Sequence, residues 1–138
     1  MMNHILIVED EKIVREGLAR ALSHSYITYQ ACDYIEALEI INSNGEIMVV
    51  LSDLKVPETE GFDMLKKIRS VNEEIKVIFL TAFFSAESVV EAMRRGAFDY
   101  ITKPVDLRKL QATIKNAVEN IESGQNPTKN IQQNGGLQ

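Results

Sequence analysis

Five side chains of this 138-residue chain have the chemistry to hold a metal ion and a phosphoryl group. They are three acids, a hydroxyl and an amine, each at or just after the end of a short apolar run: Glu9, Asp10, Asp53, Thr81 and Lys103. Carboxylates that lie close together repel one another unless a cation or a proton neutralises them. Mg²⁺ suits such oxygens, because it prefers six oxygen ligands and usually keeps several waters. The residue types therefore favour a Mg²⁺ site, in which Mn²⁺ could substitute.

Phosphoryl transfer is the reaction that this set of groups could support. It requires mainly positioning and charge neutralisation, because negative charge spreads over the equatorial oxygens in the transition state. Asp53 would be the nucleophile, and Lys103 and Thr81 would hold phosphoryl oxygens. Taken singly, Asp10 could cap a helix, Lys103 could be a solvated lysine and Thr81 could be an ordinary strand residue. Their joint placement favours the functional interpretation.

Five strand-and-helix pairs are predicted to position these side chains. Apolar, β-branched runs indicate buried parallel strands, and apolar residues at helical spacing indicate helices. The predicted strands are 5–8, 27–31, 47–52, 77–81 and 100–102, and the predicted helices are 11–24, 34–42, 62–70, 85–95 and 107–121. Regular alternation with short connections implies a parallel sheet covered by helices on both faces. Ligands bind at the carboxyl ends of the strands in such sheets, and the five side chains stand there.

The first predicted helix illustrates the pattern behind these assignments. Its apolar residues recur at helical spacing, so one face of the helix is expected to be apolar. These residues are Ile13, Val14, Gly17, Leu18, Ala21 and Leu22.

Composition favours a single domain, and the lone cysteine together with the lack of a signal-peptide pattern favours the cytoplasm. With 45% hydrophobic and 25% charged residues, the chain can fill one core, and two domains would be cramped in this length. The net charge of −5 disfavours direct binding of nucleic acid. The apolar runs are far shorter than the roughly 20 residues that cross a bilayer, so no membrane span is expected. Cys32 is the only cysteine and cannot form an internal disulfide.

We expect a folded domain over residues 1–122 and a flexible polar tail or linker over 123–138.

Four stretches of the sequence resemble the receiver family of two-component response regulators. They are residues 5–11, residues 51–54 with Pro57 and Gly61, residues 79–82, and residues 96–104. The resemblance implies a flavodoxin-like α/β fold: a doubly wound, five-stranded parallel sheet of five strand-helix units, with strand order 2-1-3-4-5. Within the family, the run from Ala92 to Leu107 is most similar to receivers joined to nitrogen-regulator-type ATPase activators.

The resemblance assigns metal and phosphoryl roles to individual residues. Asp53 matches the phosphorylated aspartate, and Asp10 matches the acid that binds the metal directly. Glu9 matches the outer acid, which acts through water, and it stands where Asp is more frequent in the family. Lys55, two residues after Asp53, would supply its backbone carbonyl to the metal.

Three further positions match the family's switching apparatus. Thr81 and Lys103 match its hydroxyl and lysine, and Tyr100 matches the aromatic switch, whose ring turns inward when Thr81 moves towards the phosphoryl group. Tyr100 could also be an ordinary aromatic residue on an edge strand. The Lys103-Pro104 peptide bond is expected to be cis, which is rare except before proline.

Phe83 departs from what the family needs for rapid loss of the phosphoryl group. In the family, the positions of Lys55 and Phe83 flank the path of the hydrolytic water. A phenylalanine ring cannot orient a water molecule, so we hypothesise a long-lived phosphorylated state unless a partner phosphatase intervenes.

The expected function follows from these assignments. Asp53 would take a phosphoryl group from a sensor histidine kinase or a small phosphodonor. The face formed by 85–95, 100–102 and 107–121 would then control a partner, which could be a second copy or an output domain absent from this chain. The protein would catalyse only its own phosphorylation and dephosphorylation. This region contains several apolar residues. Most of them are expected to lie in the core, and some are expected to form a face for a partner. They are Val89, Val90, Met93, Ala97 and Phe98.

Three alternatives differ from this function. An interaction module of the same fold that works without phosphorylation usually lacks a key residue, whereas all five are present here. A haloacid-dehalogenase-like phosphatase would need a second Asp at position 55, which is Lys. A flavin-binding flavodoxin would need a Gly-rich or hydroxyl-rich loop where residues 9–11 are three acids that would repel phosphate.

Overall fold

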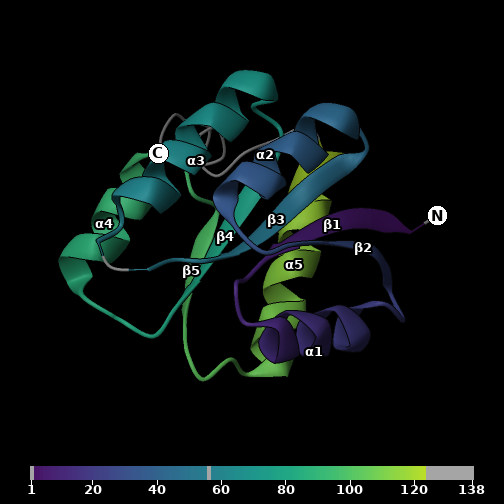
Figure 1. The fold of residues 1–138 in the computed structure, drawn as a ribbon, viewed down its shortest axis with the longest axis horizontal. Helices are drawn as coiled ribbons and strands as arrows, with labels where there is room; N and C mark the ends of the chain where they lie inside the picture. Colours follow the sequence, from purple (N-terminus) through teal and green to yellow (C-terminus); the bar gives the residue numbers. More distant parts are fainter. Residues whose placement is uncertain (1, 56, 124–138) are drawn as a thin grey trace, which may run out of the picture.

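Five parallel strands form the centre of the molecule, and each is followed by a helix (Figure 1). The structure is a computed structural model that describes residues 2–55 and 57–123. The strands are β1 (Asn3–Val8), β2 (Tyr26–Ala31), β3 (Ile47–Asp53), β4 (Lys76–Thr81) and β5 (Asp99–Thr102). They pair in the order β2-β1-β3-β4-β5, which confirms the predicted fold. β1 and β3, which lead to the three acids, are therefore neighbours inside the sheet.

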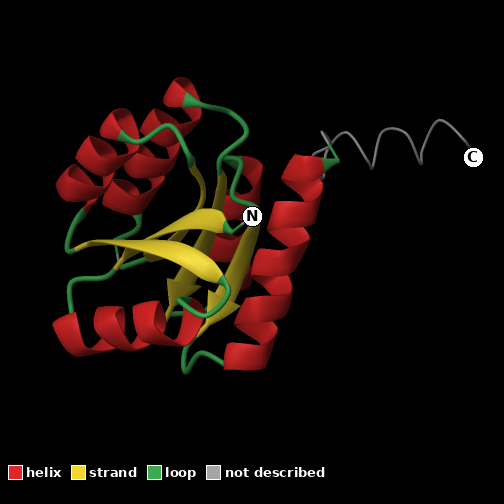
Figure 2. Ribbon diagram, turned by 90° about the vertical axis from the view of Figure 1, so that its right-hand side faces the viewer, coloured by secondary structure: helices red, strands yellow, loops and turns green. Residues whose placement is uncertain are grey.

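Helices cover both faces of this sheet (Figures 1 and 2). They are α1 (Lys12–Leu22), α2 (Tyr34–Ser43), α3 (Thr59–Val71), α4 (Ala86–Arg94) and α5 (Leu107–Glu122). α1 and α5 pack on one face, and α2, α3 and α4 pack on the other. No helix in the described part of the chain has the length and apolar content to span a membrane.

Alternate residues of the strands enter two separate cores, because successive side chains of a strand point to opposite faces. In β1, Leu6 and Val8 join the core under α2, α3 and α4, whereas Ile5 and Ile7 join the core under α1 and α5. Strands buried on both faces explain the unbroken apolar runs of the sequence.

Side-chain caps start two of the helices near the candidate site, α2 and α4. Asp33 accepts a hydrogen bond of 2.8 Å from the Glu36 N–H at the start of α2, and Ser85 accepts one of 3.0 Å from the Ser88 N–H at the start of α4. At α1 the N-cap is Glu11, which makes no side-chain cap. Asp10 therefore does not cap this helix, and its carboxylate is available to the site.

Two helices differ in detail from the sequence pattern. α3 begins at Thr59, three residues before the predicted start. Of the apolar face expected for α1, Leu22 lies in the core but Ile13 is 87% exposed; Ala19, which the predicted face did not include, is also buried. Of the predicted tail at 123–138, all but Ser123 lies outside the described residues.

Gly96 ends α4 and turns the chain into β5. Its φ of +105° is a conformation that side chains with a Cβ rarely adopt. A Cβ at this position would also lie 2.8 Å from the Arg69 side chain. The tight turn fixes the start of the short strand that carries Tyr100 and leads to Lys103.

Candidate metal and phosphoryl site

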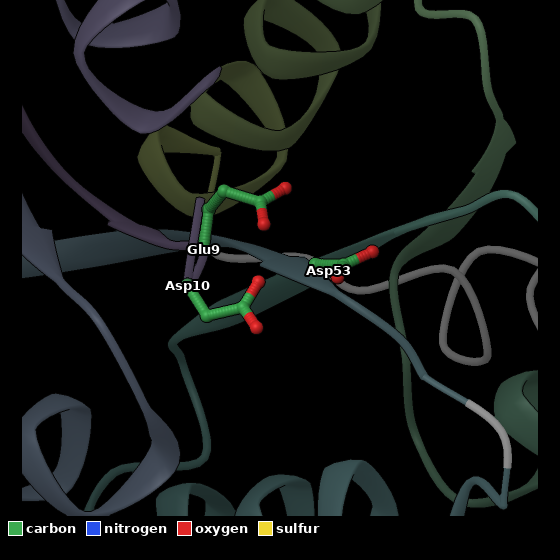
Figure 3. Close-up of side chains that lie close together, drawn as sticks. All are labelled: Glu9, Asp10 and Asp53. Atoms are coloured by element: carbon green, nitrogen blue, oxygen red, sulfur yellow. The ribbon is translucent and has the colours of Figure 1, made fainter. Parts of the chain in front are cut away.

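Glu9, Asp10 and Asp53 meet at the carboxyl ends of β1 and β3 (Figure 3). Val8 pairs with Ser52 in the parallel ladder, so the acids that follow come from adjacent strand ends. One carboxylate oxygen from each residue lies within 4.8 Å of the others. The fold thus brings together the three acids that the sequence singled out.

These acids differ in burial and charge. Glu9 is 3% exposed, and burial raises the pKa of its carboxyl despite hydrogen bonds from the Glu11 N–H and Lys103. Asp10 is exposed and forms an ion pair with the Lys55 ammonium. That hydrogen-bonded pair lowers the pKa of Asp10 and raises the pKa of Lys55. Lys55 was expected to act through its backbone carbonyl, and its side-chain contact with Asp10 is an additional feature.

Lys103, which directly follows the edge strand β5, contacts two of the acids. Its Nζ lies 3.0 Å from Glu9 Oε1 and 3.0 Å from Asp53 Oδ1. Burial opposes the charge of Lys103, but the hydrogen bonds to Asp53 and Glu9 outweigh it, so the pKa of Lys103 is raised. Its backbone N–H donates to the Thr81 carbonyl at 2.7 Å, and the Lys103-Pro104 peptide bond is cis. These contacts therefore fix the Lys103 ammonium beside the Asp53 carboxylate.

Thr81 lies at the end of β4, and its hydroxyl bonds to the backbone. Thr81 Oγ1 is 3.0 Å from both the Leu54 and the Phe83 carbonyl oxygens, and it accepts a hydrogen bond of 3.0 Å from the Phe83 N–H. Leu54 directly follows Asp53, so this hydroxyl joins the end of β3 to the segment between β4 and α4.

Tyr100 is turned into the protein. Its side chain belongs to the core beneath α4, with 9% of the residue exposed. Its hydroxyl donates to the Phe83 carbonyl at 2.9 Å and lies 3.3 Å from Ser88 Oγ. The Phe84 ring packs edge-on against the Tyr100 ring. Thr81 and Tyr100 thus share the Phe83 carbonyl as a neighbour.

Three contacts to the backbone of the acids were missed by the sequence analysis. The Tyr34 and Ser52 hydroxyls donate to the Asp53 carbonyl at 3.0 and 3.1 Å, and Arg15 Nη1 donates to the Glu9 carbonyl at 2.9 Å. Burial and then the nearby Asp53 charge raise the pKa of Tyr34 to about 12. No local pattern marks Tyr34 or Arg15, because both contacts depend on the packing of helices against the sheet.

A cavity of about 470 Å³ opens from the three acids. It runs between α2 and α3, and Ile35, Leu38 and Met64 give it an apolar wall. The acids themselves offer only oxygen ligands, the donor set that hard divalent cations prefer. The residues present therefore fit a Mg²⁺ ion.

Comparison with known proteins places this arrangement in a family. The model of the response regulator receiver domain matches residues 5–115. Over 119 residues the chain is 39% identical to the regulatory protein AtoC of Escherichia coli (strain K12), covering 86% of this chain and 26% of AtoC. Over 132 residues it is 33% identical to the DNA-binding transcriptional regulator NtrC of the same strain, covering 95% of this chain and 28% of NtrC.

Solved structures agree with these sequence matches. The crystal structure of a response regulator receiver domain protein from Clostridium thermocellum superposes with a TM-score of 0.81 at 30% identity, covering 88% of this chain and 98% of that one. The chain spans about a quarter of the length of AtoC and NtrC. Their similarity confirms the predicted likeness to nitrogen-regulator-type receivers. Members of the matched family typically bind Mg²⁺ and are phosphorylated. This chain belongs to the response regulator receiver domain family of two-component signalling.

Proposed function

We propose that Asp53 is the phosphoacceptor and takes a phosphoryl group from a sensor histidine kinase or a small phosphodonor. The observation that carries this proposal is the position of the Lys103 ammonium, 3.0 Å from Asp53 Oδ1, beside two further carboxylates. A carboxylate flanked by a fixed cation and by oxygen ligands for a metal has the surroundings that phosphoryl transfer requires.

In the transfer, a carboxylate oxygen of Asp53 forms a bond to phosphorus while the bond from phosphorus to the donor breaks. The donor atom is the imidazole nitrogen of a phosphohistidine or the carboxyl oxygen of acetyl phosphate, and it leaves with the bonding electron pair. Lys103 then holds a phosphoryl oxygen, and Thr81 can offer its hydroxyl to another. The chain performs this reaction on itself and acts on no other substrate.

A divalent cation would be held by Asp10 and Asp53, with the Lys55 carbonyl as a further ligand and Glu9 acting through water. Mg²⁺, or Mn²⁺ in its place, supplies positive charge for the phosphoryl oxygens. The oxygen-only cluster supports this assignment.

The signal would leave the site through Thr81 and Tyr100. If Thr81 turns towards a phosphoryl oxygen, it gives up its contact with the Phe83 carbonyl, which Tyr100 also contacts. A local charge change would thereby bias the packing of α4 and β5.

The partners of this chain follow from the family. Receiver domains of response regulators interact with histidine kinases and output domains, and AtoC and NtrC extend well beyond the matched region. We infer a cytoplasmic setting, in which the face formed by α4, β5 and α5 contacts an output domain or a second copy. The exposed apolar side chains of Val90 and Met93 on α4 support such a contact. The net charge of −5 gives no support for direct contact with nucleic acid.

Intact mass after incubation with acetyl phosphate, with and without Mg²⁺, tests the phosphoacceptor. We expect the wild type to gain one phosphoryl mass only when metal is present, and Asp53→Ala to gain none. Asp63→Ala is the matched control, because Asp63 is an exposed acid on α3 that lines the same cavity. A wild type that gains no mass would favour an interaction module that works without phosphorylation.

A further inference from the structure

Tyr34 reaches the phosphoacceptor from a different layer of the fold. It is the first residue of α2, and its hydroxyl donates a hydrogen bond of 3.0 Å to the carbonyl oxygen of Asp53, 19 positions along the chain. The side-chain cap at Asp33 fixes the backbone immediately before Tyr34. The ring is half-buried and lines the cavity that opens from the acids. The contact thus connects a capped helix start to the main chain of Asp53.

The Asp53 carbonyl lies where the pairing of β3 with β1 ends, although Asp53 still pairs with Leu80 of β4 on the other side. The ladder between β1 and β3 ends at the pair Val8 and Ser52, one residue before Asp53. Beyond this point, the Asp53 carbonyl accepts from two side-chain hydroxyls, those of Tyr34 and Ser52. The hydroxyls therefore hold the chain where ladder hydrogen bonds to β1 no longer do.

The surroundings of the Tyr34 hydroxyl leave it little freedom. A Cβ added at Gly61 would lie 3.2 Å from this hydroxyl and 2.4 Å from Leu54 Cδ1. The first turn of α3 thus approaches the same point closely, and the missing side chain at Gly61 leaves the space that the phenol occupies.

We propose that Tyr34 is a positioning residue for the phosphoacceptor, whose hydroxyl holds the main chain of Asp53 so that the carboxylate meets the divalent cation and Lys103 together. The inference rests on the proposed function of Asp53. Its physical basis is pre-organisation: a ligand whose backbone is already fixed loses less conformational freedom when the cation binds.

Tyr34→Phe removes only the hydroxyl and tests the idea directly. We expect the dissociation constant for Mg²⁺, measured by calorimetry, to rise about fivefold, which corresponds to a single hydrogen bond of about 1 kcal/mol. Labelling by acetyl phosphate should slow at low Mg²⁺ and return towards the wild-type rate at saturating Mg²⁺. A general loss of structure would not produce this split.

Tyr29→Phe is the matched control. Tyr29 is also a partly buried tyrosine against the same core, and its hydroxyl makes a hydrogen bond of 2.7 Å with His4 Nδ1 on β1. Its loss should affect stability without changing Mg²⁺ affinity. Ser52→Ala removes the other hydroxyl that donates to the Asp53 carbonyl, and it should also weaken Mg²⁺ binding. This variant provides a second test if Tyr34→Phe folds poorly.

The outcomes separate this inference from the proposed function. A wild type that binds Mg²⁺ and gains phosphoryl mass, with a Tyr34→Phe variant that matches it in both, overturns the role of Tyr34 alone. Equal weakening in Tyr34→Phe and Tyr29→Phe overturns it as well, because the effect would then be general. A wild type that neither binds Mg²⁺ nor gains mass overturns the proposed function and the role of Tyr34 with it.

Discussion

The Tyr100 hydroxyl donates a hydrogen bond of 2.9 Å to the carbonyl oxygen of Phe83. The Thr81 hydroxyl lies 3.0 Å from the same oxygen and 3.0 Å from the Leu54 carbonyl. Because this hydroxyl has a single hydrogen, it can donate to only one of the two at a time. A change of partner at Thr81 therefore alters the environment of the Tyr100 hydroxyl, which connects the acidic site to the core beneath α4.

Tyr100→Phe should loosen the segment between β4 and α4. Loss of one buried hydrogen bond is expected to lower the free energy of unfolding by about 1 kcal/mol. Amide exchange of residues 83–85 should become faster, as measured by hydrogen exchange with mass detection. Tyr26→Phe, which removes a hydroxyl at the opposite end of the sheet, should leave this segment unchanged. Unaltered exchange in Tyr100→Phe would mean that the hydroxyl does not hold the segment.

Lys55→Met should strengthen binding of Mg²⁺. The Lys55 ammonium pairs with Asp10, so a cation must replace it at that carboxylate. The two side chains are 54% and 49% exposed, and exposed pairs contribute at most about 1 kcal/mol. We expect a gain in affinity of about two- to fivefold by calorimetry. Lys67→Met changes another lysine that lines the cavity and is the control. Weaker binding in Lys55→Met would show that Lys55 assists the metal instead of competing with it.

Phe83→Glu should shorten the lifetime of the phosphorylated state. The Phe83 side chain is half exposed, so a carboxylate can replace it without being buried, and it can orient a water molecule where the ring cannot. The decay of the phosphorylated mass after removal of acetyl phosphate measures the lifetime. Phe84→Glu places the same charge one residue further along and separates position from charge. A lifetime in Phe83→Glu equal to that of the wild type would contradict the hypothesis that Phe83 protects the phosphoryl group.

Lys76→Met should stabilise the protein and change its response to pH. Lys76 is 7% exposed, and burial, followed by the charge of Arg69, lowers its pKa from 10.5. The unfolded chain then binds more protons than the folded one, so this residue makes stability rise as pH increases through the lowered pKa towards 10.5. We expect Lys76→Met to lack this rise and to gain about 1 kcal/mol at neutral pH.

Denaturant unfolding across this pH range compares Lys76→Met with Lys66→Met, a change at an exposed lysine of α3. Lys66→Met should keep the wild-type pH response. A Lys76→Met protein that is less stable than the wild type at neutral pH would indicate that the ammonium is well solvated or paired.

The alternation of strands and helices could be predicted because it follows from the local spacing of apolar residues. Short apolar runs separated by amphipathic segments fix the parallel sheet, and such sheets bring their carboxyl ends together. Glu9, Asp10 and Asp53 could therefore be grouped before the structure was known. The start of α3 at Thr59 is not evident in the sequence, because Gly61, a poor helix former, lies in the first turn and the apolar spacing begins only at Phe62.

Contacts across layers could not be predicted in the same way. The Tyr34 hydroxyl meets Asp53 because α2 packs over the end of β3, and nothing in the sequence around Tyr34 encodes that distance. The Lys55 side chain could point to solvent or to Asp10, and the residues around Lys55 in the sequence do not distinguish the two. Helical spacing likewise identified the apolar side of α1 but not that Ile13 lies outside the core.

The charges of the site nearly cancel before any metal binds. Three carboxylates, those of Glu9, Asp10 and Asp53, meet the ammonium groups of Lys55 and Lys103, so three negative charges face two positive ones. Many small metal-binding domains are unfolded without their metal, because metal binding supplies the free energy that stabilises the fold. Here the lysines act as internal counter-ions. Treatment with a chelator should consequently leave the domain folded and ready to be reloaded.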